Sequence, residues 1–301
     1  MFQKVLVCTD FTDGLQRLVH FVPQLAASGI QQITFLHVLP LDSDRSIPKP
    51  DPEKERQVRD RLTLPPSAGR LAGDQAAGGV EIRVEVQWGR PVDAILHLAQ
   101  AGGVDLILMG TPIRSLLAEK LFGSTLVSVC QRSAVPVMLF RPQLLSVYTN
   151  EELALRCQHL FRYLLVPYDS SRAADYLVQQ IRQRAQTDGN VLEQCLLTWV
   201  ITEGGRRELP KDYQIEEAKT RLAAAKTALE SANLTIETRI LRGEPIPEIL
   251  LAAIDYDISA IAISSERFGK LSELSAPSFA GELLRRSGHP IIYFPFRRTA
   301  S

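Results

Sequence analysis

The stretch Val104-Asp105-Leu106-Ile107-Leu108-Met109-Gly110 decides the fold. An almost unbroken apolar run that ends in glycine is typical of a strand buried on both faces of a sheet. Gly123-Ser124-Thr125 follows and opens a predicted helix, which ends before the apolar run at residues 135–140. We therefore expect a buried strand, a long loop, a helix and a further strand, in that order.

The start of this helix is suited to binding an anion. Gly123-Ser124-Thr125 would place backbone N–H groups and two hydroxyls at a helix N-terminus. Gly123 lies 13 residues after Gly110, which is longer than an ordinary strand-to-helix connection. Two interpretations stay open: a cradle for phosphate, or a glycine that ends the strand and a serine that caps the helix with nothing bound.

The composition narrows the class of protein. A chain of 301 residues suggests two domains. The 34 basic and 34 acidic side chains leave no net charge to attract nucleic acid or a membrane surface, so neither is an expected partner. There is no apolar run of about 20 residues and no signal peptide. The four cysteines are scattered, as reduced thiols in a cytoplasmic protein would be.

The order of elements predicts an α/β fold. Strands are expected at residues 4–10, 33–38, 80–87, 104–110 and 135–140, with helices between them. This order is typical of an open parallel sheet with helices on both faces. Residues 40–78 are rich in proline, glycine and charge, and we interpret them as a mobile surface excursion with one helical piece around residues 53–62.

The same order then recurs in the second half of the chain. Gly89-Arg90-Pro91 is echoed by Gly243-Glu244-Pro245, 154 positions later. The pairs Gly110 and Ser264, and Pro136 and Pro290, keep the same offset. Three landmarks at one offset indicate a tandem duplication. The predicted domains are residues 1–143 and 161–301, joined by a linker at 144–160.

A carboxylate follows the first predicted strand of each half. Parallel sheets bind ligands at the carboxyl ends of their strands, so Asp10 and Gly110 would face one crevice. A carboxylate there can accept hydrogen bonds from a ribose hydroxyl or from the amino group of adenine. The alternative is that Asp10 only caps the helix that follows it. Neither a Ser-His-Asp set nor histidines at metal-ligand spacing stand out, so we expect no catalytic residue and no metal site.

With these features the chain resembles the universal stress protein (UspA-like) family in its tandem two-domain form. The resemblance rests on Val5-Leu6-Val7-Cys8-Thr9-Asp10, on Leu36-His37-Val38, on Gly89-Arg90-Pro91 and on residues 105–136. Nucleotide-binding members carry a loop of the form G-x2-G-x9-G-[ST]. Gly110, Gly123 and Ser124 match it, whereas Ile113 stands at the second glycine, where a β-branched side chain takes room needed by ribose or phosphate.

The resemblance implies a fold, ligands and site residues. The fold would be two tandem Rossmann-like domains of the adenine nucleotide alpha hydrolase type, each with a five-stranded parallel open sheet. The first domain would bind ATP or AMP, with Mg²⁺ accompanying ATP, and hydrolysis would be slow at most. Asp10 and the backbone of Val38 would contact the adenine and the ribose. The loop that contains Ile113 would run beside the phosphates. The phosphate contacts would come from Gly110, Gly123, Ser124 and Thr125.

The second half departs further from the family loop. At the offset of 154 it has Ser264, Arg267, Pro277 and Ser278. Proline at 277 lacks an N–H that could face a phosphate. We therefore predict that the second half binds no nucleotide in the family manner and serves as a scaffold or regulator.

The sequence alone leaves two hypotheses for the function. One is a cytoplasmic stress-response protein that binds an adenine nucleotide in its first half. The other is a universal stress protein fold without nucleotide that acts through protein interactions. The family pairs through its last strand, so the two halves are expected to pair as an intramolecular pseudo-dimer, and a homodimer or protein partner stays open. The candidate interface residues are Met138, Phe140, Ile292, Tyr293 and Phe294.

Overall fold

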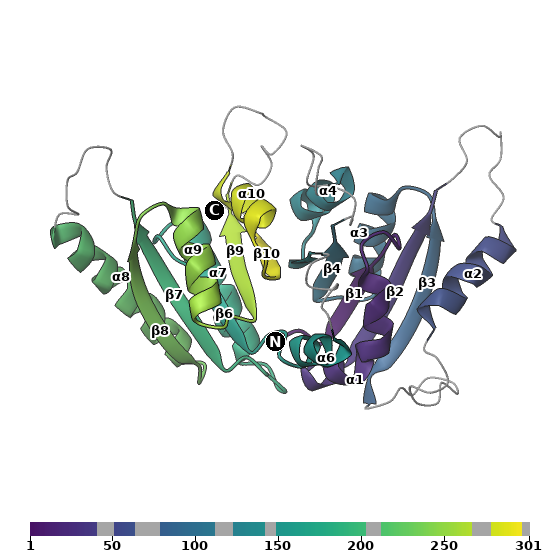
Figure 1. Ribbon diagram of the computed structural model, residues 1–301, viewed down its shortest axis with the longest axis horizontal. Helices are drawn as coiled ribbons and strands as arrows, with labels where there is room; N and C mark the ends of the chain where they lie inside the picture. The colour runs from purple at the N-terminus through teal and green to yellow at the C-terminus, as the bar shows by residue number, and fades with distance from the viewer. Residues whose placement is uncertain are drawn as a thin grey trace. The chain divides into compact units, whose positions relative to one another are not determined.

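The chain folds into two compact units, Phe2–Gln158 and His159–Ser301, which we call the N-terminal and C-terminal units. The computed structural model describes residues 1–40, 51–63, 79–111, 123–141, 149–202, 212–266 and 278–296. Figure 1 shows the helices and strands of both units. The boundary falls at the end of helix α6 (Asn150–Gln158), within the segment that the sequence suggests as a linker.

The N-terminal unit contains a parallel sheet with the order β3-β2-β1-β4-β5. Its strands are β1 (Lys4–Cys8), β2 (Gln32–Leu39), β3 (Glu81–Trp88), β4 (Leu106–Gly110) and β5 (Val137–Phe140). The apolar run that we take as decisive forms β4, and Leu106, Ile107, Leu108 and Met109 are all buried. The α/β prediction with a five-stranded parallel sheet is thus confirmed for this unit.

Helices connect these strands in the pattern of a doubly wound sheet. They are η1 (Leu15–Phe21), α1 (Val22–Ala27), α2 (Pro52–Leu62), α3 (Pro91–Ala101) and α4 (Ser124–Arg132). Right-handed crossovers place η1, α1 and α2 on one face and α3 and α4 on the other. Helix α3 packs against α4, and the ion pair between Arg132 and Asp93 at 3.0 Å joins them, while α1 packs against α6.

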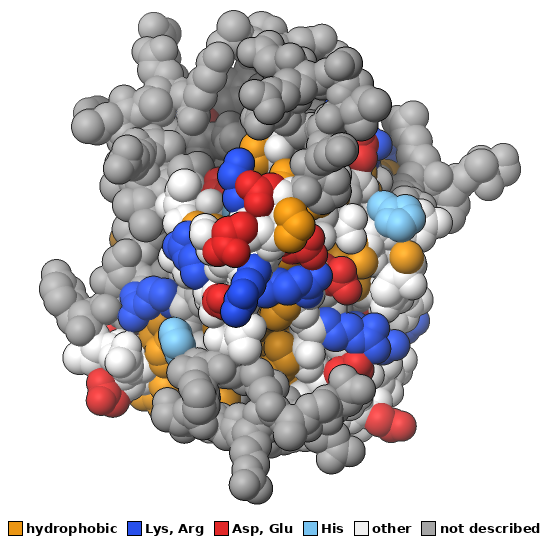
Figure 2. All heavy atoms as spheres, turned by 90° about the vertical axis from the view of Figure 1, so that its right-hand side faces the viewer, with side chains coloured by type: hydrophobic (Ala, Val, Ile, Leu, Met, Phe, Trp, Pro, Cys, Tyr) orange, Lys and Arg blue, Asp and Glu red, His pale blue; other side chains and the backbone are white. Residues whose placement is uncertain are grey.

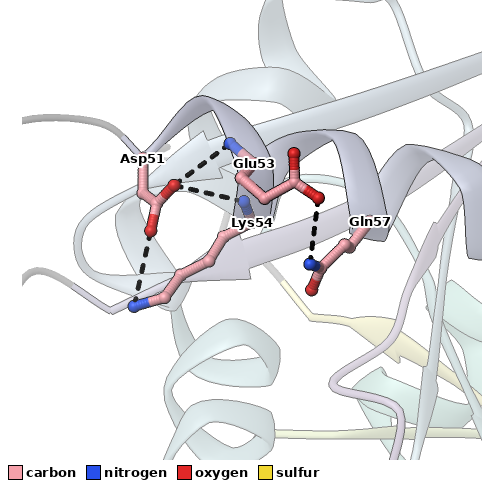
Figure 3. A network of polar contacts seen from close by, with 4 residues as sticks. All are labelled: Asp51, Glu53, Lys54 and Gln57. Carbon is pink, nitrogen blue, oxygen red and sulfur yellow. Dashed lines mark hydrogen bonds and ion pairs between the residues drawn. The ribbon is translucent and has the colours of Figure 1, made fainter.

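Helix α2 forms at the place where the sequence predicts a helical piece. Asp51 caps it by accepting hydrogen bonds from the N–H groups of Glu53 and Lys54, at 3.0 and 3.3 Å (Figure 3). Pro52 suits the first turn because its missing N–H is not needed there. Residues 41–50 and 64–78 of the expected mobile excursion lie outside the described residues.

Helix α2 is docked rather than free, which differs from the mobile excursion that we expect. Leu62 is fully buried, and the guanidinium of Arg59 donates to the carbonyl oxygen of Val84 in β3 at 2.7 Å. Figure 2 views the side of the molecule that carries α2 and shows basic and acidic side chains intermixed there. The pair between Arg59 and Glu55 at 3.1 Å is one example. The apolar stripe of α2 therefore faces the unit, and its charges face solvent.

The C-terminal unit repeats this topology. Its sheet has the order β8-β7-β6-β9-β10 with all described pairs parallel. The strands are β6 (Tyr163–Pro167), β7 (Gln194–Ile201), β8 (Thr235–Arg242), β9 (Ala260–Ser265) and β10 (Ile291–Pro295). The helices are α7 (Arg172–Ala185), α8 (Asp212–Glu230), α9 (Pro245–Asp255) and α10 (Phe279–Arg286). None of the helices in the described part of the chain is long and apolar enough to span a membrane.

The duplication predicted from the sequence is visible element by element. Strands β3 and β8, and likewise helices α3 and α9, are related by the same offset of 154 positions at both ends. Earlier in the chain the offset differs: it is 159 between β1 and β6 and 162 between β2 and β7. The changes of offset fall in the connections between strands, where insertions are tolerated because they leave the sheet pairing intact.

Candidate functional site

A cavity of about 170 Å³ opens where the N-terminal sheet changes its direction of winding. Strand β1 lies between β2 and β4. Cys8 of β1 pairs with Met109 of β4 near the carboxyl ends of these two strands. Ligands of open parallel sheets bind at this point, because the connections leave the two strands in opposite directions. Five of the predicted site residues line the cavity: Asp10, Val38, Gly110, Gly123 and Thr125.

Two predicted site residues stand apart from these five. Ser124 is exposed at the start of α4 and is not among the residues that line the cavity. Ile113 lies outside the described residues, as do Arg267 and Pro277 of the second half. The cavity therefore brings together the two ends of the predicted site, the carboxylate after β1 and the start of α4.

Asp10 forms a tight turn of its own after β1. One of its carboxylate oxygens, Oδ1, accepts hydrogen bonds from the N–H and the hydroxyl of Thr12, at 2.8 and 2.7 Å. In the part of the chain that the structure describes, the other oxygen has no hydrogen-bond partner. The alternative that Asp10 caps the next helix is wrong, because the residue that precedes η1 is Gly14. Asp10 is exposed and has one oxygen available for a ligand.

Phe11 adopts a left-handed conformation directly after Asp10, with φ of 66°. This backbone conformation is costly for a bulky residue, so it needs compensation from its surroundings. The Phe11 ring stacks on His37 with 4.5 Å between ring centroids, and the guanidinium of Arg61 in α2 lies 3.8 Å from the Phe11 ring centroid. The stack of Arg61, Phe11 and His37 thus holds the turn that presents Asp10.

His37 packs against the turn that follows β1. Its Nδ1 lies 2.8 Å from the carbonyl oxygen of Thr9, which can only accept, so Nδ1 carries the proton. Burial lowers the pKa of His37. The neutral ring therefore serves to fix the turn between β1 and η1.

The start of α4 leaves its backbone N–H groups free of side-chain caps. Its N-cap is Gly123, so the serine cap considered above is wrong. Gly123 has φ of −61°, which any residue adopts, and a Cβ atom built there would meet no described atom within 4 Å. Neither the backbone nor the packing of the described residues demands glycine at 123. No described atom fills the space beside Gly123 at the helix N-terminus, where an anion is stabilised.

Gly110, in contrast, is required by packing. A Cβ atom built on it would lie 2.6 Å from the Cβ of Asp13, which is closer than such atoms approach. The backbone of β4 therefore passes directly over Asp13. The glycine at the end of β4 has a structural explanation that needs no ligand.

Asp13 is the site residue that sequence reasoning missed. It is only 4% exposed and lines the cavity. Its Oδ1 accepts hydrogen bonds from the hydroxyl of Thr9 at 2.8 Å and from the N–H of Leu15 at 2.9 Å. Burial raises the pKa of Asp13 to about 6, because the ionised carboxylate loses its hydration. The sequence gives one hint of this role: Asp13 follows Asp10 by three residues, so both can belong to the turn after β1.

The described lining of the cavity contains two carboxylates, of Asp10 and Asp13, and no lysine, arginine or histidine. An anion there would meet the backbone N–H groups of α4 and no described basic side chain. The Cys8 thiol also lines the cavity, and burial raises its pKa far above the ordinary value, so it is no nucleophile at neutral pH. Among the described residues, no group of three His, Cys, Asp or Glu side chains could hold a metal ion.

The C-terminal unit has a cavity at the equivalent place, between the ends of β6 and β9. Ser264 occupies the position of Gly110, and its hydroxyl donates to the carbonyl oxygen of Phe294 at 2.8 Å. At the start of α10, the side chain of Ser278 accepts a hydrogen bond from the N–H of Gly281 at 3.1 Å. The N-cap side chain therefore uses an N–H group at the start of α10, whereas the glycine N-cap of α4 uses none.

The fold and the two cavities define a tandem α/β protein with a switch-point site in each unit. The sequence model of the universal stress protein family matches residues 1–141 and 161–295. The chain belongs to the universal stress protein family.

The chain is similar to individual universal stress proteins. Universal stress protein Rv1636 of Mycobacterium tuberculosis is 30% identical over 141 residues, which are 46% of this chain and 95% of that protein. The crystal structure of a universal stress protein from Archaeoglobus fulgidus covers 96% of this chain and 97% of its own, at 20% identity and a TM-score of 0.67. A universal stress protein solved in complex with cAMP is 28% identical over 45% of this chain and 94% of its own, with a TM-score of 0.30.

We predict that Asp13→Asn changes how the stability of the N-terminal unit depends on pH. In the wild type, the folded state keeps its proton up to about pH 6, whereas the unfolded state loses it near pH 4. The free energy of unfolding should therefore fall as the pH rises from about 4 to 6. The asparagine, which can still accept from Thr9 and Leu15, should remove this fall and be more stable at pH 7 by up to about 3 kcal/mol.

Urea unfolding at pH 4 and pH 7 measures this difference, with Trp88 as the fluorescent reporter in a Trp199→Phe background. The two proteins should be nearly equal at pH 4 and differ at pH 7. Parallel stability curves across this range would show that the Asp13 carboxyl is not desolvated.

Substitution by alanine should be more destabilising at Gly110 than at Gly123. Gly110→Ala forces a Cβ into Asp13 and should lower the free energy of unfolding by about 1–3 kcal/mol. Gly123→Ala places its Cβ in open space and should cost less than about 1 kcal/mol, the difference between the two residues at an N-cap. Urea unfolding of the two variants, again followed through Trp88, makes the comparison. Equal losses would contradict the distinction between a packing glycine and an unconstrained one.

Proposed function

We propose that the N-terminal unit binds ATP or another adenine nucleotide at the β1–β4 cavity and acts in a stress response through this ligand. The observation that carries the proposal is Gly123. It is a glycine that neither φ nor the described packing requires, at the uncapped start of a helix that opens beside a carboxylate. A phosphate would account both for the space beside Gly123 that no described atom fills and for the helix start without a side-chain cap.

The two ends of the cavity suit different parts of a nucleotide. The free oxygen of Asp10 and the backbone of Val38 would hold the adenine and ribose. Gly110, Gly123 and Thr125 line the opposite end, and Ser124 adds an N–H at the helix start. A volume of about 170 Å³ is below the roughly 300 Å³ of an ordinary ligand pocket, so the phosphates would extend past α4 toward solvent. Ile113 belongs to the loop that would border them.

Mg²⁺ would enter with ATP rather than reside on the protein. The described residues contain no metal-binding group of three, and the cavity contributes two carboxylates and no described cation. A divalent ion on the phosphate oxygens would offset the repulsion between these carboxylates and the phosphates. We therefore expect ATP to bind more tightly with Mg²⁺ than without it.

We propose binding rather than catalysis as the activity. The described lining of the cavity includes no histidine, lysine or arginine that could activate a nucleophile. The Cys8 thiol stays protonated. The nucleotide would thus act as a ligand or a switch, with slow hydrolysis at most.

A second function deserves a test, because one observation favours it. Two carboxylates without a described basic partner make a poor anion site, and the sequence has Ile113 where the family loop has glycine. A chain that binds no nucleotide would act as an interaction scaffold in the cytoplasm. Pairing of the halves through their last strands, a homodimer and a protein partner stay predictions under either function.

Calorimetric titration of nucleotide-stripped protein with ATP and with AMP separates the two functions. We expect saturable binding at one site per chain, weakened at least tenfold in Gly123→Val, whose side chain would fill the space beside the helix start. Gly288→Val is the matched control, since a Cβ built on this exposed glycine of the C-terminal unit also meets no described atom within 4 Å. No heat of binding up to millimolar ATP, or equal affinity in Gly123→Val, would support the scaffold instead.

A further inference from the structure

Helix α9 has apolar residues on its outer side as well as on the side that packs on the sheet. It lies against β7 (Figure 1), and Ile249, Ala252 and Ala253 are buried. On the outer side, Leu251 and Ile254 are 54% and 66% exposed. A surface helix of an ordinary domain is polar on the side that faces solvent. The outer side of α9 therefore lacks a partner among the described residues.

The exposed residues form a stripe along the helix. Pro247, Leu250, Leu251 and Ile254 follow the spacing i, i+3, i+4 and i+7, which brings them to one side of a helix. Pro247 and Leu250 are partly exposed, so the stripe is accessible along its length. We call these four residues the outer stripe.

A row of carboxylates runs beside the outer stripe. Glu244, Glu248 and Asp255 are separated by four and seven residues, so they lie along one edge of the stripe. In the part of the chain that the structure describes, none of the three carboxylates has an ion-pair partner. The sequence from Glu244 to Asp257 contains no lysine, arginine or histidine. We call these three residues the acidic row.

Helix α3, the counterpart of α9 in the N-terminal unit, has neither feature. Leu96 is the one apolar residue among the four that correspond to the outer stripe, which are Asp93, Leu96, His97 and Gln100. None of the residues that correspond to the acidic row is acidic: they are Arg90, Ala94 and Ala101. Because the two helices have equal length and the same place in the topology, the fold requires neither the stripe nor the row.

The charge of this face selects among possible partners. A second copy of the chain, paired through α9 about a two-fold axis, would set the acidic row against its own copy, and like charges repel. An anionic membrane surface would meet the same repulsion. A helix with an apolar stripe and basic residues beside it complements both features, since its apolar side covers the stripe and its cations face the carboxylates.

We propose that the outer side of α9 docks a basic amphipathic helix of a partner protein. The apolar residues of that helix cover Leu251 and Ile254, and its lysine or arginine side chains pair with Glu244 and Asp255. Helix α9 has 11 residues, so the contact is small and the complex is transient. The inference is independent of nucleotide binding, because it rests only on the surface of the C-terminal unit.

The test titrates the full chain, without nucleotide, into a fluorescein-labelled synthetic peptide and follows the fluorescence anisotropy. The peptide has about 14 residues, or about four helical turns, with leucine at helical spacing along one side and lysine elsewhere. A second peptide has glutamate in place of every lysine. We expect saturable binding of the lysine peptide and at least tenfold weaker binding of the glutamate peptide. Salt should weaken the lysine peptide between about 0.05 and 0.3 M, because it screens exposed charges.

Two variants test the two features separately, and both use the residues of α3. Leu251→His with Ile254→Gln removes the apolar stripe and should weaken the lysine peptide at least tenfold. Glu244→Arg with Asp255→Ala removes most of the acidic row, so it should weaken binding about fivefold and reduce its salt dependence. All four side chains are exposed and Glu244 makes no side-chain cap, so both variants should fold, which circular dichroism checks.

A transplant provides the matched control. His97→Leu with Gln100→Ile, made in the Leu251→His and Ile254→Gln chain, moves the exposed apolar pair to α3, where no acidic row accompanies it. This chain should bind the lysine peptide no better than its parent.

Five results would overturn the proposal. The peptide results are no saturable binding of the lysine peptide up to about 0.1 mM, equal binding of the two peptides, and binding that is unchanged in Leu251→His with Ile254→Gln. Binding restored by the transplant would show that exposed apolar residues alone suffice. A dimer of the free chain in sedimentation, lost in Leu251→His with Ile254→Gln, would assign the face to a second copy instead.

Discussion

The close approach of Gly110 to Asp13 is the constraint on which the N-terminal site depends. Strand β4 passes so near Asp13 that no Cβ fits between them, and this contact closes the floor of the cavity. Asp13 in turn accepts from Thr9 and Leu15, and Thr9 accepts from the N–H of Phe11 at 3.0 Å. The turn that presents Asp10 is therefore held by a buried carboxyl group. A buried network of this kind is rigid when all its polar groups are hydrogen-bonded, and ionisation of its carboxyl group costs free energy.

The duplicated fold shows how two sites of one origin diverge without a change of topology. The left-handed residue after the aspartate is kept in both units, at Phe11 and Ser170, with φ of 66° and 54°. The backbone that carries the carboxylate is thus preserved even though the side chains differ. Stability comes from the sheet and its packed helices, so the residues at the strand ends are free to vary.

Three exchanges account for most of the chemical difference between the cavities. The uncapped glycine at the start of α4 becomes a serine cap at α10, a threonine hydroxyl becomes the ring of Phe279, and Leu36 becomes Thr198. The first two leave the start of α10 less suited to an anion than the start of α4.

The sequence by itself determined the order of strands and helices along the chain, the duplication and the family, because the apolar runs, the glycines after them and the repeated offset can be read from residue types and spacing alone. It also placed five of the seven predicted site residues in one cavity, since the carboxyl ends of parallel strands meet. Only the tertiary structure decided that Asp13 is buried, that Gly110 is a packing glycine, and that no described residue makes the same demand at Gly123. These facts depend on contacts between residues far apart in the chain, which no local pattern records.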